Sequence, residues 1–171
     1  FAEMYPPIRK WLAEIPQRSL VDWSRLDRDF ESLSEMSERT IGVPALRGNA
    51  VVLISDWHEV FDRIIADINA AQSSCHLEFY IWTTGGRADE VVDALIAAAQ
   101  RGIVCRVLVD AMGSRAFLKS DAVQRMRDAD VMVTAALPGG LLRMPFVRFD
   151  LRLHRKIVVI DGHITYCGSQ N

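Results

Sequence analysis

The 171-residue sequence has few of the residues that build metal centres or disulfide frameworks. It contains four histidines and only three cysteines, and no two cysteines form a Cys-x-x-Cys pair. Cys75, Cys105 and Cys167 each lie in an apolar, strand-like run, so we expect free, buried thiols in a reducing compartment. This cysteine and histidine spacing does not predict a zinc site.

Long hydrophobic runs are also absent. Half of the residues are hydrophobic, but they are dispersed, and no run approaches the ~20 apolar residues of a membrane-spanning helix. The sequence shows no signal peptide and begins with Phe1. Because it also stops on the last residue of a motif, we expect it to be a piece of a longer protein, so the missing span does not argue against a membrane protein.

The net charge of -2 hides two halves of opposite sign. Residues 1–100 hold 9 Lys and Arg against 16 Asp and Glu, whereas residues 101–171 hold 11 against 6. A basic second half suits a site that attracts an anionic substrate, although a solvated basic face would have the same composition. A general nucleic-acid binder is more often basic throughout, so we expect no nucleic-acid partner.

Residues 1–40 are predicted to form a helical and linker segment apart from the rest. Apolar residues recur at helical spacing over residues 1–15, where Pro6-Pro7 would set the start of the helix. A second amphipathic helix is expected over residues 22–39. The apolar stripe of the first helix either packs on its own domain or lies on a membrane surface.

Residues 41–171 are predicted to form an α/β domain that follows a linker at Gly42-Val43-Pro44. Strand-like and helix-like segments alternate, which implies a β-sheet flanked by helices. A hairpin at the end of the chain would make that sheet mixed. We expect a buried strand at residues 49–54, further strands at 75–82, 103–110 and 131–135, and helices at 56–71 (N-capped by Asp56), 89–101 (ended by Gly102) and 120–128.

The last eighteen residues carry the strongest chemical pattern. A β-branched run over residues 155–160, the turn pair Asp161-Gly162 and a short apolar run over 164–167 predict a β-hairpin. Side chains alternate along a strand, so His154 and Lys156 should share a face. A tight bend at residues 168–171 adds a hydroxyl and an amide. A nucleophile, a cation and two neutral donors suit a phosphate, although a buried hairpin with an incidental histidine is the plainer alternative.

The spacing His154-x-Lys156-x4-Asp161-x6-Gly168-Ser169-x-Asn171 resembles the full signature of the phospholipase D superfamily. Six identities at fixed spacing are far more specific than a lone glycine fingerprint. Together with residues 77–82, 101–106, 110–114 and 150–156, the motif is similar to the first half of bacterial cardiolipin synthases. Those enzymes carry two such halves and, upstream, membrane-spanning helices.

The resemblance implies a phosphatidyltransferase. His154 would attack the phosphorus of phosphatidylglycerol, Lys156 would neutralise a non-bridging oxygen, and Ser169 and Asn171 would donate hydrogen bonds around it. A second phosphatidylglycerol would take the phosphatidyl group and give cardiolipin, with glycerol released. The general acid would be the histidine of a second motif half, from the same full-length chain or a dimer mate. No metal or other cofactor is implied, and the Lys156 ammonium would repel a cation bound at His154.

Three further features are less specific. Asp161 belongs to the catalytic signature, but its strand parity and turn position suggest that it holds the hairpin and does not touch phosphorus. Glu78 is the lone charge in an apolar strand and either lines the site or faces solvent at a sheet edge. Residues 141–149 mix apolar side chains with Arg143 and Arg148, which suits either an interfacial loop on anionic lipid or a core-packing segment.

Three functions are therefore considered. The first is a lipid phosphatidyltransferase at the bacterial inner membrane, with its catalytic part on a reducing aqueous side and anionic membrane lipid as partner. The second is a single-motif phosphodiesterase or nuclease that completes its site by dimerising. The third is a non-catalytic lipid-binding module that kept the hairpin.

Overall fold

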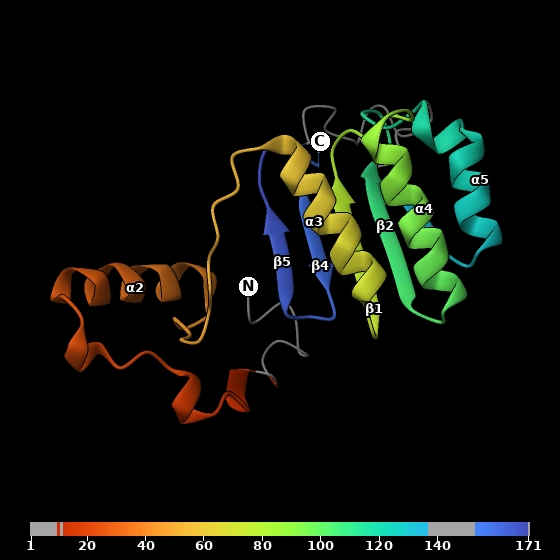
Figure 1. Ribbon diagram of the computed structural model, residues 1–171. Coiled ribbons are helices and arrows are strands. Elements are labelled where there is room, and N and C mark those ends of the chain that lie inside the picture. Colours follow the sequence, from red (N-terminus) through yellow and green to blue (C-terminus); the bar gives the residue numbers. More distant parts are fainter. Residues whose placement is uncertain (1–9, 11, 137–152, 171) are drawn as a thin grey trace. The chain divides into compact units, whose positions relative to one another are not determined.

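The computed structural model describes residues 10, 12–136 and 153–170 (Figure 1). The chain divides into two compact units, Phe1–Leu53 and Ile54–Asn171. Within the described part of the chain, no helix is both long and apolar enough to cross a membrane.

The first unit contains the helix α2 (Arg28–Ile41), which follows two short 3-10 helices at Gln17–Ser19 and Trp23–Arg25. The helix predicted over residues 22–39 is thus divided. Asp22 caps the second 3-10 turn by accepting from the Ser24 amide, and Asp27 caps α2 by accepting from the Asp29 amide. Gly42, at φ 75°, ends α2 in the left-handed conformation.

The strand predicted at residues 49–54 is wrong. These residues form no regular element, and Val51 and Leu53 are 91% and 93% exposed. An apolar run becomes a strand only when neighbouring strands satisfy its backbone groups, and no described strand pairs with this segment.

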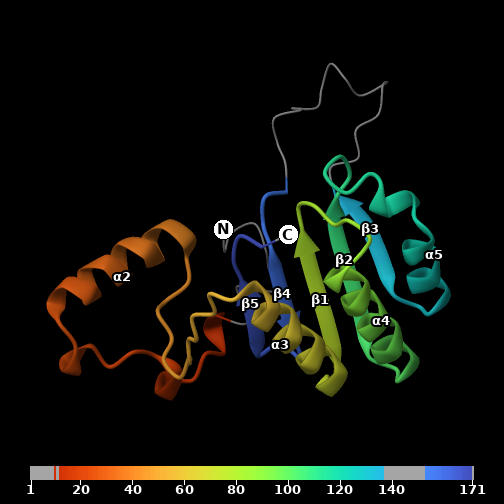
Figure 2. The same ribbon diagram turned by 45° about the horizontal axis from the view of Figure 1, so that its top comes forward.

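The second unit is built on a five-stranded sheet in the order β3-β2-β1-β4-β5 (Figure 2). The predicted mixed sheet is confirmed: β1 pairs with β2 and β2 with β3 in parallel, whereas β1 pairs with β4 and β4 with β5 antiparallel. The strands are β1 (Ser74–Phe79), β2 (Val104–Asp110), β3 (Met132–Ala136), β4 (Ile157–Ile160) and β5 (Ile164–Cys167).

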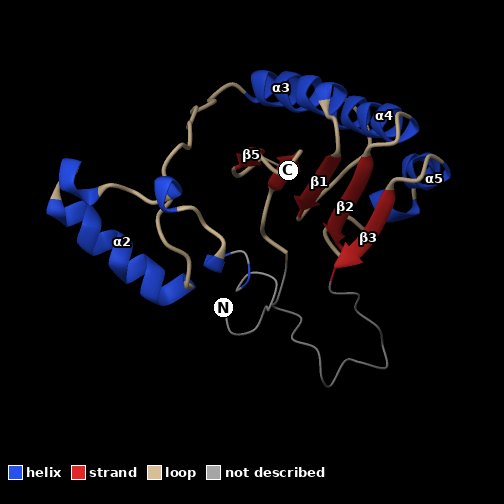
Figure 3. Ribbon diagram, turned by 90° about the horizontal axis from the view of Figure 1, so that it is seen from below, coloured by secondary structure: helices blue, strands red, loops and turns tan. Residues whose placement is uncertain are grey.

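The helices α3 (Trp57–Ala70), α4 (Arg87–Gln100) and α5 (Asp121–Asp128) lie on one side of this sheet (Figure 3). Asp56 caps α3 as predicted, through a 2.8 Å bond from the His58 amide. Alternate strand side chains meet the helices in one core, and fully burying each large apolar side chain contributes about 1.5–3 kcal/mol. Its members include Ile64, Ile68, Val92, Leu95, Cys105, Val107, Val109, Val158 and Ile160.

The β4–β5 hairpin forms at the predicted turn. Asp161 and Gly162 take φ values of 52° and 72°, a left-handed conformation that aspartate and glycine tolerate better than most residues. On β5, the Tyr166 hydroxyl donates to the Asp67 carboxylate of α3. Burial, together with this bond, raises the pKa of Tyr166 well above its usual value.

The Asp161 carboxylate fastens the hairpin turn to the start of β1. It accepts the backbone amides of Ser74 (2.9 Å), Gln72 (2.9 Å) and Ser73 (2.7 Å), and also the Ser73 hydroxyl at 2.8 Å. The Asp161 amide in turn donates to the Ser74 carbonyl. These donors, with the Ser74 amide first, hold the pKa of Asp161 far below its usual range.

Because the pKa of Asp161 is lowered on folding, its ionised form stabilises the fold above its unfolded pKa of about 3.9, and that contribution is lost as pH falls toward the folded value. Asp161→Asn keeps a residue that tolerates the left-handed turn but removes the charge. We expect it to lower the melting temperature at pH 7, with the difference from the wild type narrowing as the pH drops below about 4.

Asp130→Asn is the matched control, since Asp130 is exposed and also left-handed (φ 64°), without these amide donors. Thermal unfolding followed by circular dichroism between pH 2 and pH 8 measures both variants. Equal melting temperatures for Asp161→Asn and Asp130→Asn at pH 7 would contradict the anchoring role.

Candidate active site

The two ends of the motif meet at one end of the hairpin. His154 and Lys156 come just before β4, and Gly168 comes just after β5. The Gly168 amide donates to the Lys156 carbonyl at 3.4 Å, which brings Ser169 beside the start of β4. His154, Lys156 and Ser169 therefore lie near one place.

That place is the edge of the sheet where β1 and β2 end. Ile157 pairs with Glu78 in the antiparallel register, so the chain entering β4 passes the carboxyl end of β1. The parallel partner β2 ends at Asp110 on the same edge. Open α/β sheets bind ligands outside the carboxyl ends of their strands, where the strand order changes direction, as it does here at β1.

His154 and Lys156 share one aromatic neighbour, Tyr80. The imidazole of His154 is exposed and stacks on the Tyr80 ring, with centroids 4.8 Å apart and planes at 28°. The Lys156 Nζ atom lies 5.7 Å from the same ring centroid and donates to the His154 carbonyl at 3.1 Å. Strand β4 begins at Ile157, two residues later than expected, so both His154 and Lys156 precede it, and Tyr80 is where they converge.

Tyr80 is the residue that the sequence interpretation missed. It follows β1 in an apolar run and looks like core, and only the pairing of β1 with β4 brings it to His154. Asp110 and Ser114 were also missed, although both are 1% exposed polar residues that follow a buried strand. A buried carboxylate and hydroxyl directly after an apolar strand are the signal that points to them.

Asp161 lies at the opposite end of β4 from His154. Seven residues separate the two, and at ~3.3 Å per strand residue this places them roughly 20 Å apart. The Asp161 carboxylate binds the start of β1 instead, at the edge where β1 begins.

Glu78 and the other expected site residues are placed as follows. Glu78 lies on β1, which pairs on both sides, so its expected alternative position at a solvent-facing sheet edge is wrong. It is half-buried, and none of the described residues forms an ion pair with it. Ser169 is exposed beside the site. Asn171 and the segment 141–149 lie outside the described residues.

The free thiols are only partly as expected. Cys75 and Cys105 are buried and directly paired in register between β1 and β2, whereas Cys167 is exposed. Cys167 ends β5 on the sheet face opposite the helices, so the expectation that it is buried is wrong. Within the described ranges, no group of three His, Cys, Asp or Glu residues is placed to hold a metal ion.

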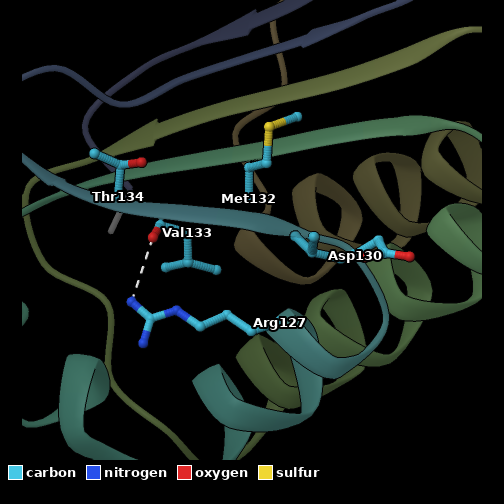
Figure 4. A pocket seen from close by; sticks show the side chains of 6 residues that line it. Arg127, Asp130, Met132, Val133 and Thr134 are labelled. Atoms are coloured by element: carbon cyan, nitrogen blue, oxygen red, sulfur yellow. Dashed lines mark hydrogen bonds between the residues drawn. The ribbon is translucent and has the colours of Figure 1, made fainter.

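A separate hollow of about 350 Å³ lies along the edge strand β3 (Figure 4). Arg127 spans it and donates to the Val133 carbonyl at 3.4 Å, while Met132 and Thr134 point to the other side of the strand. The hollow contains none of the motif residues, so it is not the site described above.

Comparison with known proteins agrees with this geometry. The family described as "Cardiolipin synthase, PLD-like domain" matches residues 64–171. The chain is 39% identical over 168 residues to cardiolipin synthase A of Citrobacter koseri and of Salmonella arizonae, which covers 98% of this chain and 35% of each relative. The chain thus spans about a third of the length of these relatives.

Among solved structures, NucT from Helicobacter pylori superimposes with a TM-score of 0.50 at 20% identity. The match covers 71% of this chain and 72% of that chain, and it supports the fold alone. The family match spans β1 to β5 and includes every motif residue from His154 to Asn171. The chain belongs to the family of cardiolipin synthase phospholipase D-like domains.

Proposed function

We propose that this chain supplies the nucleophilic half of a phosphatidyltransferase site that makes cardiolipin from two molecules of phosphatidylglycerol. The observation that carries the proposal is the convergence of His154 and Lys156 on Tyr80, next to the bend at Gly168 and Ser169. The similarity to cardiolipin synthase A supports the choice of lipid substrate.

In the first step, an imidazole nitrogen of His154 attacks the phosphorus of one phosphatidylglycerol. A nitrogen–phosphorus bond forms as the bond from phosphorus to the head-group glycerol oxygen breaks. That oxygen takes a proton from a general acid and leaves as glycerol. We assign the acid to a second motif half, in the complete protein or in a dimer mate.

In the second step, a head-group hydroxyl of another phosphatidylglycerol attacks the phosphatidyl-histidine. The group that acted as acid now accepts the proton of this hydroxyl. A new phosphorus–oxygen bond forms, the nitrogen–phosphorus bond breaks, and His154 is restored. The product is cardiolipin.

Charge stabilisation is the task of Lys156. Lys156 is half-buried as a residue, and its ammonium group donates to the His154 carbonyl, which keeps this cation beside the imidazole where it can neutralise a non-bridging oxygen. Ser169 and Asn171 are assigned as neutral donors to the same phosphate. This scheme uses no metal or other cofactor, and its partners are anionic lipids at a bacterial membrane surface.

The scheme predicts different losses for the two motif side chains in the complete protein. His154→Ala should abolish cardiolipin formation, because no nucleophile remains. Lys156→Ala should slow the reaction by roughly 10²–10³-fold, as for deletion of one oxyanion donor. The measurement is the initial rate of cardiolipin formation from phosphatidylglycerol vesicles.

Two matched variants serve as controls. Arg155→Ala removes an exposed cation next to Lys156, and His163→Ala removes a histidine at the far end of the same hairpin. Both should retain near wild-type rates. A Lys156→Ala protein as active as Arg155→Ala would overturn the assigned role of Lys156.

The lipid assignment predicts a binding preference. At one physiological salt concentration, the 171-residue chain should bind phosphatidylglycerol vesicles more tightly than single-stranded DNA, since both interactions depend on salt and must be compared under the same conditions. Vesicle sedimentation and fluorescence anisotropy measure the two affinities. Tighter binding to DNA would favour the dimeric phosphodiesterase or nuclease instead.

A further inference from the structure

Tyr80 holds the two motif side chains together. We infer that its ring is a positioning platform that fixes the orientation of the His154 imidazole and the separation of His154 from Lys156. The inference rests on the proposed roles of His154 and Lys156, and it adds a residue outside the His-x-Lys motif to the working site.

The stack restrains the imidazole through one of its two faces. Within the described part of the chain, no side chain or backbone group hydrogen-bonds to the His154 ring, and the residue is exposed. The 4.8 Å centroid separation lies in the range of favourable aromatic contacts. Because one ring face rests on Tyr80, the stack limits how far the imidazole can tilt out of its plane.

The Tyr80 ring also positions the ammonium group of Lys156. Lys156 Nζ at 5.7 Å from the centroid is within the ~6 Å reach of a cation–π interaction. The Lys156 ammonium group also donates a hydrogen bond to the His154 carbonyl, so it contacts the backbone of the proposed nucleophile as well as the Tyr80 ring. Loss of the ring would therefore loosen both groups together.

Tyr80 is held by hydrogen bonds and close packing from the turn that follows β2. The Ser114 hydroxyl donates to the Tyr80 carbonyl at 3.1 Å and accepts the Trp82 amide at 2.9 Å. Gly113 packs so closely that a Cβ atom there would lie 2.5 Å from the Tyr80 carbonyl oxygen and 3.0 Å from a ring carbon. Only glycine permits this approach, so the turn holds both the backbone and the ring of Tyr80.

The buried carboxylate of Asp110 links this turn to the motif. It accepts the amides of Met112 (2.9 Å) and Gly113 (2.8 Å), which shape the turn, and the amide of Leu153 at 3.2 Å. Leu153 is the residue directly before His154. One buried side chain thus binds both the turn that holds Tyr80 and the backbone directly before His154.

The first experiment observes the stack itself, in the 171-residue chain. With only four histidines, each imidazole Cε1–H signal can be assigned by NMR from single His→Gln variants. Tyr80→Leu removes the ring current over His154 and should shift its signal downfield, whereas Tyr80→Phe should leave it in place. His58, whose ring centroid lies 3.5 Å from the Trp57 ring centroid, is the internal reference, and its signal should not move.

The variant Phe79→Leu tests whether the His154 signal responds to loss of the stack or to any loss of stability. Phe79 is the neighbouring aromatic and packs edge-on against Trp82, with centroids 5.4 Å apart. Its loss should lower the melting temperature without moving the His154 signal. Gly113→Ala is the converse variant, since it displaces the Tyr80 ring without removing it and should move the His154 signal.

The second experiment measures catalysis in the complete protein. A misplacement of about 1 Å can cost up to ~10²-fold in rate, so Tyr80→Leu should lower kcat roughly 10- to 100-fold with little change in KM. Tyr80→Phe should restore the wild-type kcat. A purely structural role would instead give losses that follow the melting temperature, with Phe79→Leu as low as Tyr80→Leu.

The two experiments fail in different ways. An unchanged His154 signal in Tyr80→Leu would overturn the platform, whatever the activity. A shifted signal together with a wild-type kcat would also overturn it. If His154→Ala keeps full transferase activity, the proposed function fails, while the stack would still be visible by NMR.

Discussion

The antiparallel pairing of β1 with β4 is the constraint on which the site depends. It joins strands that are separated by about eighty residues of sequence, with Cys75 opposite Ile160 and Glu78 opposite Ile157. At one end of this pair the chain entering β4 passes Tyr80, and at the other end the turn after β4 meets the start of β1. The register of this strand pair therefore positions both His154, before β4, and Asp161, after β4.

The spacing of the motif follows from this arrangement. From Lys156 to Asp161 the chain crosses the sheet along β4, a distance of roughly 17 Å at strand geometry, and β5 brings it back to Gly168. At the end of β4, the Asp161 carboxylate accepts hydrogen bonds from backbone amides at the start of β1. His154 stays exposed at the near end, where its only described ring contact is with Tyr80. The anchor at Asp161 and the proposed nucleophile His154 thus lie at opposite ends of one strand.

Local patterns in the sequence predicted those parts of the fold that local physics decides. The Asp56 cap and the Asp161-Gly162 turn were both visible in short segments. The strand predicted at residues 49–54 was wrong, because an apolar sequence does not by itself provide a neighbouring strand to pair with. The sequence likewise suggested that Asp161 braces the hairpin, but its actual partners at residues 72–74 depend on long-range pairing.

The site was predicted less completely than the fold. The motif identified His154 and Lys156 because their types and spacing carry phosphate chemistry. Tyr80 could not be found in this way, since a tyrosine after an apolar strand is typical of a core. Gly113 and Ser114 matter only through their close approach to Tyr80, which becomes apparent once β1 and β2 lie side by side.

The most direct test of the account is to locate the covalent intermediate. The complete protein would be mixed with phosphatidylglycerol labelled at phosphorus, quenched in alkali within one turnover, digested, and the labelled peptide sequenced by mass spectrometry. We expect an acid-labile, alkali-stable phosphoramidate on the His154 imidazole that is absent from His154→Ala. Label on any other residue, or product formed in one turnover with no labelled protein, would contradict His154 as the nucleophile.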